Sequence, residues 1–263
     1  MCRLLGVVSA RAASVADGLG PSPLAQFTSL ARLHSDGWGM AWLTSSGALQ
    51  SRTSPLSAAE DPEFGALTRQ VRTRAAVAHL RWASPGLEVC AANTHPFRDG
   101  DRAFVHNGTI RPLAELDALL SDDLRRALVG TTDSERYFRL VLQHIAAADD
   151  EARGIVDAVS LLRARFPTAS LNAMLLTSDR LYVVHASDGT GGPVRELTER
   201  LADRAPIPHD HLDRYFQMSY RIDQDAIRIA SSGMTEPGWS PLPADSVLVV
   251  DIDSLATAVH ALE

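Results

Sequence analysis

The order of apolar segments along the chain predicts an α+β fold built from packed sheets and helices. Strand-like runs precede, separate and follow the helical segments, so the strict strand–helix alternation of a parallel sheet is missing. The 263 residues, 45% hydrophobic and 22% charged, are typical of a soluble globular protein with a sizeable core. No internal repeat or Pro/Gly/Ser-rich linker divides the sequence, so we expect one domain over residues 1–263.

Short apolar runs rich in valine, leucine and alanine predict the strands. They cover Cys2–Ser9, Trp38–Leu43, Ala75–Arg81, Ala103–His106, Asn172–Leu176, Leu181–Ala186, Ala226–Ala230 and Ser246–Asp251. Two polar stretches, residues 44–63 and 187–214, are expected to be irregular, and neither is long enough to demand a domain boundary.

Helical periodicity covers residues 22–33, 112–128, 133–147 and 151–165. Within 133–147 the apolar positions follow the 3.6-residue period of a helix: Tyr137, Phe138, Leu140, Val141 and Ile145. Thr132, Asp133 and Glu135 stand at its beginning, in a pattern typical of a helix start.

Charge and composition exclude several classes of function. The net charge is −7, and no basic patch favours nucleic acid as a partner. No run of eighteen apolar residues predicts a membrane span. The first residues lack the pattern of a signal peptide, so we expect a cytoplasmic protein.

All 25 basic residues are arginine, because the sequence contains no lysine. This excludes Schiff-base chemistry on a lysine of this chain and a Walker-type phosphate loop. The two cysteines, Cys2 and Cys90, do not form a disulfide framework, and we interpret Cys90 as a passive thiol.

Cys2 directly follows the initiator methionine. Methionine before so small a residue is usually trimmed in cells, which would place a thiol and a free α-amine on Cys2. Their reference pKa values, about 8.5 and about 7.7–8.0, make proton exchange between them nearly thermoneutral. An N-terminal nucleophile that uses its own amine as base is a known activation route. The alternative is a small buried residue at the start of a strand.

Asn107 and Gly108 follow an apolar strand and offer a side-chain amide and a backbone N–H to an oxyanion. The same dipeptide is also the commonest hairpin turn signal.

Arg81 ends another apolar strand and can hold a carboxylate with two parallel hydrogen bonds. Asp133, at a helix N-terminus, can cap the helix or pair with an ammonium. Arginine and aspartate together would hold the carboxylate and the amine of an α-amino acid. The alternative for Arg81 is a surface ion pair.

These motifs, in this order, resemble the class II glutamine amidotransferases, which are N-terminal-nucleophile hydrolases. The resemblance rests on Met1-Cys2, Leu80-Arg81-Trp82-Ala83-Ser84, Asn93-Thr94-His95-Pro96, His106-Asn107-Gly108 and Thr132-Asp133-Ser134-Glu135. It implies a four-layer αββα sandwich. The motif set spans residues 1–140, and residues 230–243 resemble the later part of stand-alone members.

The resemblance also implies a role for each matching residue. Cys2 would be the nucleophile and its α-amine the base, while Asn107 and Gly108 would form the oxyanion hole. Arg81 would bind the α-carboxylate of a glutamyl group and Asp133 its α-amine. The pocket would be lined or supported by Trp82, Ser84 and His95.

Pro85 stands where synthase-linked members often carry histidine, which makes this chain more similar to stand-alone members. The nine histidines form no His-Glu-x-x-His pattern. His209-Asp210-His211 has two metal-binding side chains but no further ligand nearby in sequence, so we interpret it as a solvated loop. No metal or organic cofactor is expected.

Three functions remain open from the sequence. The first is hydrolysis of glutamine through a thioester on Cys2, with ammonia passed to a separate synthase. The second is hydrolysis of a γ-glutamyl-cysteine-type conjugate, as in ergothioneine biosynthesis or glutathione degradation, with a peptidase as a possible partner. The third is a regulatory or binding protein with this fold and no activity. Arg81 and Asp133 do not separate the first two, because they would contact only the glutamyl half of the substrate.

Overall fold

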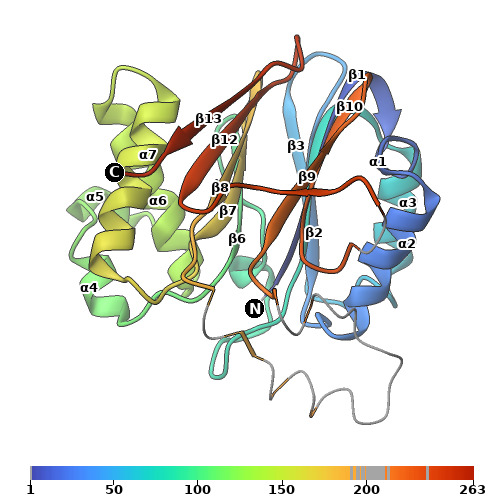
Figure 1. Cartoon of the computed structure of the whole chain (residues 1–263). Helices are drawn as coiled ribbons and strands as arrows, with labels where there is room; N and C mark the ends of the chain where they lie inside the picture. Colours follow the sequence, from blue (N-terminus) through green and yellow to red (C-terminus); the bar gives the residue numbers. More distant parts are fainter. Residues whose placement is uncertain are drawn as a thin grey trace.

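Two antiparallel sheets lie face to face between two layers of helices in the computed structural model (Figure 1). The model describes residues 2–189, 192–193, 196, 199, 211, 214–234 and 237–263. The layer order of helix, sheet, sheet and helix confirms the αββα sandwich that the resemblance implies.

The first sheet has the strand order β11-β9-β10-β1-β4-β2-β3. Its central strand β1 (Arg3–Ser14) pairs with β4 (Arg72–Leu80) on one side and β10 (Ala226–Ser231) on the other. The other strands of this sheet are β2 (Trp38–Leu43), β3 (Leu49–Ser54), β9 (Met218–Ile222) and β11 (Ser240–Pro241).

The second sheet has the strand order β13-β12-β8-β7-β6-β5. Neighbouring strands along its whole width run antiparallel. Its strands are β5 (Phe97–Asp99), β6 (Arg102–Asn107), β7 (Asn172–Leu176), β8 (Arg180–His185), β12 (Ser246–Asp251) and β13 (Thr257–Ala261).

Different helices cover the outer faces of the two sheets (Figure 1). The first sheet is covered by α1 (Val15–Leu19), α2 (Pro21–Ser29) and α3 (Pro62–Gln70). The second is covered by α4 (Leu113–Asp117), α5 (Asp122–Arg126), α6 (Asp133–Ala147) and α7 (Glu151–Arg165). Two 3₁₀ turns, Leu30–Arg32 and Ala91–Asn93, complete the elements of the described chain. None of the described helices is long and apolar enough to cross a membrane.

Strand β1 is apolar on both faces because it separates two cores. Leu4 and Val8 join the core between the sheets, whereas Leu5 and Val7 join the core under α1–α3. Successive side chains of a strand point to opposite faces, so this alternation follows from the strand geometry. Burying each such side chain contributes about 1.5–3 kcal/mol before entropy is counted. The start of the chain is therefore held rigidly in the middle of the molecule.

The long periodic helices agree with the sequence prediction at both ends, since α6 and α7 span 133–147 and 151–165. The prediction of one helix over 112–128 is wrong. The chain turns between α4 and α5, and the Ser121 side chain caps α5 by accepting a hydrogen bond from the Leu124 N–H (3.4 Å). The helix predicted over 22–33 ends at Ser29 and continues as a 3₁₀ turn.

The polar stretch 44–63 is not a continuous loop, because it contains β3 and the first residues of α3. β3 is an edge strand in which only Leu49 and Ser54 are buried, so its sequence is polar despite its regular pairing with β2. The stretch 187–214 lies largely outside the described residues.

Candidate active site

The ends of strands from both sheets bring the predicted site residues together around one small cavity. Cys2 precedes β1, Arg81 follows β4, and Asn107 ends β6. The cavity measures about 20 Å³, and its walls include seven of the predicted residues: Cys2, Arg81, Trp82, Ser84, His95, Gly108 and Asp133. The eighth, Asn107, contacts Cys2 directly. Segments more than 100 residues apart in sequence thus form one site.

Cys2 is nearly buried, with 7% of its surface exposed. Its nitrogen donates a hydrogen bond to the Asn107 Oδ1 atom at 2.8 Å. Its thiol lies 3.9 Å from the Trp82 carbonyl oxygen. This nitrogen is an amide while Met1 is attached, and it becomes the α-amine once Met1 is removed. Asn107 therefore fixes the atom that would serve as the base.

The surroundings of Cys2 lower the pKa of its thiol to about 6. Burial is the largest single effect and raises the pKa, because it disfavours the charged thiolate. The charge of His79 and the positive amino terminus of the chain outweigh burial and lower the pKa. At neutral pH the balance therefore favours the thiolate, which is the nucleophilic form of cysteine.

Asn107 is fully buried, and its Nδ2 amide has no hydrogen-bond partner among the residues described. A buried donor without a partner costs about 1–3 kcal/mol. Its other amide atom is held by Cys2, and its backbone carbonyl accepts a hydrogen bond from the Ser170 hydroxyl (2.9 Å). These contacts fix the orientation of the free N–H₂ group next to Cys2, and a donor to an oxyanion needs such a fixed orientation.

Gly108 has no room for a side chain. A Cβ atom at this position would lie 1.8 Å from the Ser170 carbonyl oxygen and 2.7 Å from His106 Nε2. Only glycine lets the chain leave β6 this close to its neighbours. The backbone path at Gly108, which lines the cavity with Cys2, is therefore possible only because residue 108 has no side chain.

The guanidinium of Arg81 is buried, with 3% of the residue exposed. Its hydrogen-bond acceptors are two backbone carbonyls, those of Asp36 (3.3 Å) and Glu88 (3.1 Å). No carboxylate pairs with it anywhere in the described part of the chain. A buried cation without a counter-ion is costly, and an anionic ligand in the cavity would relieve that cost.

Asp133 is the first residue of α6 and is 3% exposed. Its Oδ2 atom accepts a hydrogen bond from the Ile110 N–H at 2.6 Å, which ties the loop after β6 to the helix. Thr132 caps the helix by accepting from the Glu135 N–H (3.1 Å), as its sequence pattern predicts. Helix capping thus belongs to Thr132, and the Asp133 carboxylate faces the cavity instead.

Three buried histidines surround the thiol side of the cavity. The rings of His79 and His95 pack against each other with centroids 4.1 Å apart and planes tilted by 32°. Burial lowers the pKa of His95 far below its ordinary value, and both of its ring nitrogens lack a partner among the described residues. Burial also lowers the pKa of His106, although Asp133 opposes this effect. His106 Nε2 donates to the Ser170 carbonyl (3.0 Å), so its Nδ1 accepts from the Ser134 hydroxyl (2.9 Å).

Sequence reasoning gave no role to His79 or Arg3. His79 lies one residue before the Leu80–Ser84 motif, yet its charge lowers the pKa of Cys2. Arg3 is fully buried, stacks on Tyr215 (4.0 Å) and donates to carbonyls of Cys2, Tyr215 and Ser232. The only signal for Arg3 is a charged residue within an apolar strand, because its partners lie more than 200 residues away.

The interpretation of residues 209–211 as a solvated loop is wrong for His211. His211 is fully buried, 3.3 Å from His34 between Nε2 atoms and 3.3 Å from the Ser232 hydroxyl. Burial lowers its pKa to about 2, so it packs as a neutral ring. His209 and Asp210 lie outside the described residues. Cys90 is half-buried in the loop before Ala91–Asn93 and does not line the Cys2 cavity.

A model of the family described as "Glutamine amidotransferases class-II" matches residues 1–225 of the chain. The glutamine–fructose-6-phosphate aminotransferase of Pseudomonas putida is 26% identical over 220 residues, which are 73% of this chain and 34% of that protein. The enzyme of the same name from Haemophilus ducreyi is 31% identical over 179 residues, 65% of this chain and 27% of that protein. The chain therefore spans about a third of the length of the curated relatives it matches.

Solved structures share the fold at low identity. A glutamine aminotransferase class-II domain protein from Silicibacter pomeroyi matches over 100% of both chains, with TM-score 0.67 and 19% identity. The glutamine phosphoribosylpyrophosphate amidotransferase of B. subtilis matches all of this chain and 49% of its own length, with TM-score 0.65 and 15% identity. Because the family model covers most of the sequence, the chain belongs to the class-II glutamine amidotransferases.

Proposed function

We propose that the protein hydrolyses the γ-glutamyl amide bond of a substrate through a thioester on Cys2, after removal of Met1. One observation carries this proposal. A thiol of lowered pKa and a buried Arg81 guanidinium without a carboxylate partner in the described chain border one cavity, and Asn107, whose amide donor has no partner there, is hydrogen-bonded to the same cysteine. These groups supply a nucleophile, an oxyanion donor and an anchor for a carboxylate.

The glutamyl half of the substrate is held at its two charged groups. Arg81 binds the α-carboxylate, and Asp133 binds the α-ammonium through the oxygen that does not bond Ile110. Trp82, Ser84 and His95 line the space between them. Two charged contacts at fixed positions orient the γ-carbonyl towards Cys2, which lowers the entropic part of the barrier.

The reaction proceeds in two steps. The thiol proton passes to the Cys2 α-amine, and the thiolate attacks the γ-carbonyl carbon, so that a C–S bond forms and the carbonyl oxygen becomes an oxyanion. Asn107 Nδ2 and the Gly108 N–H stabilise this oxyanion. The C–N bond then breaks, and the ammonium returns its proton to the leaving nitrogen. Water hydrolyses the thioester, releases glutamate and restores the thiol.

The mass of the intact protein before and after treatment with 6-diazo-5-oxo-norleucine tests this proposal. We expect active material to lack Met1 and to gain one glutamine-like adduct on Cys2. Cys2→Ala should abolish labelling and turnover, whereas the control Cys90→Ala should change neither. Active protein that retains Met1, or an adduct that maps to Cys90, would refute the assignment.

A further inference from the structure

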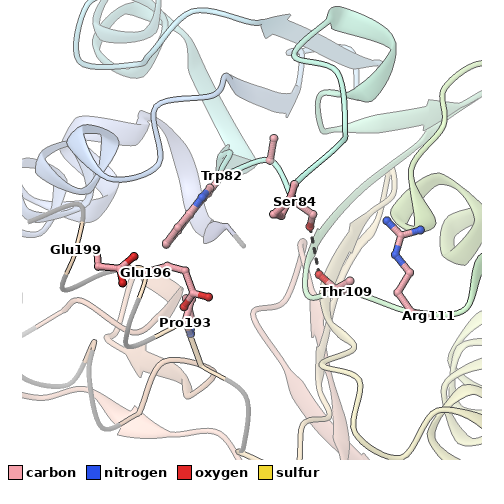
Figure 2. A pocket seen from close by; sticks show the side chains of 9 residues that line it. Trp82, Ser84, Thr109, Arg111, Pro193, Glu196 and Glu199 are labelled. Carbon is pink, nitrogen blue, oxygen red and sulfur yellow. Dashed lines mark hydrogen bonds between the residues drawn. The ribbon is translucent and has the colours of Figure 1, made fainter.

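A much larger cavity, whose lining residues are drawn in Figure 2, shares wall residues with the small cavity at Cys2. It measures about 680 Å³ and shares Trp82, Ala83 and Ser84 with the Cys2 cavity. Its remaining walls are Pro85, Thr109, Arg111, Pro193, Glu196 and Glu199. The segment 82–84 therefore forms a wall of both cavities, and its Trp82 carbonyl oxygen lies 3.9 Å from the Cys2 thiol.

The size of this cavity sets the kind of leaving group that fits it. Ammonia, the leaving group of glutamine, is about as large as a water molecule, which takes up about 30 Å³ in the liquid. Cavities of roughly 300–1,000 Å³ are typical of sites for whole organic ligands. A space of about 680 Å³ next to the proposed position of the scissile bond therefore suits a leaving amine with a large organic substituent.

Opposite charges stand on opposite sides of the cavity. Figure 2 shows Arg111 on the side of Thr109, and Glu196 and Glu199 on the far side beside Trp82. Arg111 is exposed and forms no ion pair with any residue that the structure describes. The backbone just before Arg111 is anchored, because the N–H of Ile110 donates a hydrogen bond to Asp133 Oδ2 (2.6 Å).

The wall around Trp82 is suited to a cation. An indole face attracts a positive charge, and a carboxylate beside it adds to that attraction. Trp82 is held in place by packing in a buried hydrophobic cluster with Leu33, Tyr215 and Phe216. The Glu199 side chain reaches the same wall of the cavity.

We propose that this cavity binds the leaving half of a γ-glutamyl conjugate, namely an amino acid joined through its α-amine and bearing a positively charged side chain. Arg111 binds its carboxylate, and Trp82 with Glu199 binds its positive group. This inference rests on the proposed function and selects conjugate hydrolysis over glutamine hydrolysis. When the C–N bond breaks, the Cys2 ammonium gives its proton to the leaving nitrogen, and the free amino acid departs through the large cavity before water enters.

The test measures glutamate release by the Met1-free protein from four substrates: glutamine, γ-glutamyl-lysine linked through the lysine α-amine, γ-glutamyl-norleucine and γ-glutamyl-lysinamide. We expect kcat/KM for γ-glutamyl-lysine to exceed that for each of the others by about tenfold, the effect of one charge-assisted contact. Norleucine lacks only the side-chain ammonium, and lysinamide lacks only the carboxylate.

Two variants assign these preferences to residues. Arg111→Ala should remove the preference for lysine over lysinamide, and Glu199→Gln should remove the preference for lysine over norleucine. The matched controls Arg11→Ala and Glu60→Gln, both exposed and outside the cavity, should leave all four rates unchanged.

The outcomes separate the two proposals. This inference would be overturned if the protein turned over glutamine faster than every conjugate, as a subunit that supplies ammonia to a synthase would. The thioester mechanism would then remain intact. Variants of Arg111 and Glu199 that behave like their controls would overturn it as well. Loss of all turnover together with absent labelling of Cys2 would instead overturn the proposed function.

Discussion

Replacing Arg81 by methionine should separate the binding role of this side chain from its effect on stability. Methionine keeps most of the apolar length and removes the charge. Two charge-assisted hydrogen bonds to a substrate carboxylate contribute about 1.5 kcal/mol each, so their loss predicts a fall of roughly 100-fold in kcat/KM. Lysine at this position would restore the charge but not the paired geometry, and we expect only a partial rescue.

The unliganded protein should respond very differently to Arg81→Met. The substitution removes hydrogen bonds to the Asp36 and Glu88 carbonyls, but it also removes a buried cation that has no carboxylate partner in the described chain. These effects oppose each other, because isolating a charge from water costs several kcal/mol. We therefore expect the free energy of unfolding to change by no more than about 1 kcal/mol. Glutamate should stabilise the wild type in thermal unfolding and fail to stabilise the variant.

A comparison of two substrates assigns the effect to the α-carboxylate. Glutaminamide is glutamine with an uncharged amide in place of that group. For the wild type, kcat/KM on glutaminamide should be lower than on glutamine by about the same factor as Arg81→Met lowers kcat/KM on glutamine. The Arg81→Met variant acting on glutaminamide should have a kcat/KM only slightly lower than either single change gives. If the variant lost 100-fold on both substrates alike, Arg81 would not contact this carboxylate and the reasoning would fail.

Three further predictions concern the nucleophile and the oxyanion donors. Because the pKa of Cys2 is about 6, the rate of its alkylation by iodoacetamide in a Cys90→Ser background should fall only as the pH drops through that value. His79→Gln should raise this pKa and move the fall in rate to higher pH. A rate profile that does not move would exclude His79 as the cause of the lowered pKa. Asn107→Ala should lower kcat by about 10²–10³-fold with KM little changed, measured by steady-state glutamate release, and a purely raised KM would contradict its role. Gly108→Ala places a Cβ 1.8 Å from a carbonyl oxygen, so chemical denaturation should show a loss of a few kcal/mol, and an unaltered unfolding midpoint would contradict the packing argument.

The sequence predicts the parts of the fold whose side-chain pattern is set by burial on a regular face. α6 and α7 have such a face, and their bounds agree with the structure. Edge strands lack this signal, because one side of the strand faces water. β13 is exposed along its length and only the two end residues of β3 are buried, so neither strand has the buried face that the sequence pattern detects.

The residues of the candidate site also fall into two groups, those that a local sequence pattern reveals and those that it does not. Asn107, Arg81 and Asp133 stand next to element ends, where a polar residue after an apolar run is visible in sequence. The contacts of Arg3 with residues 215 and 232, and the pairing of His34 with His211, join segments about 180–230 residues apart. No local pattern encodes such pairs, because they depend on how the whole chain folds. The cavity at Arg111 is invisible in sequence for the same reason.

The position of the nucleophile makes the proposed chemistry depend on the packing of the two sheets. Cys2 precedes the central strand of the first sheet, whereas Asn107 ends a strand of the second, and a hydrogen bond of 2.8 Å joins them. The core between the sheets, which includes Leu4 and Val105, therefore sets how closely Cys2 and Asn107, the proposed oxyanion donor, approach each other. The groups that would hold the substrate lie mainly on loops beyond the strand ends, at Arg81, Trp82 and Arg111. Substitutions in the inter-sheet core should thus lower kcat for every substrate alike, because this core sets the spacing of Cys2 and Asn107 but lines neither cavity.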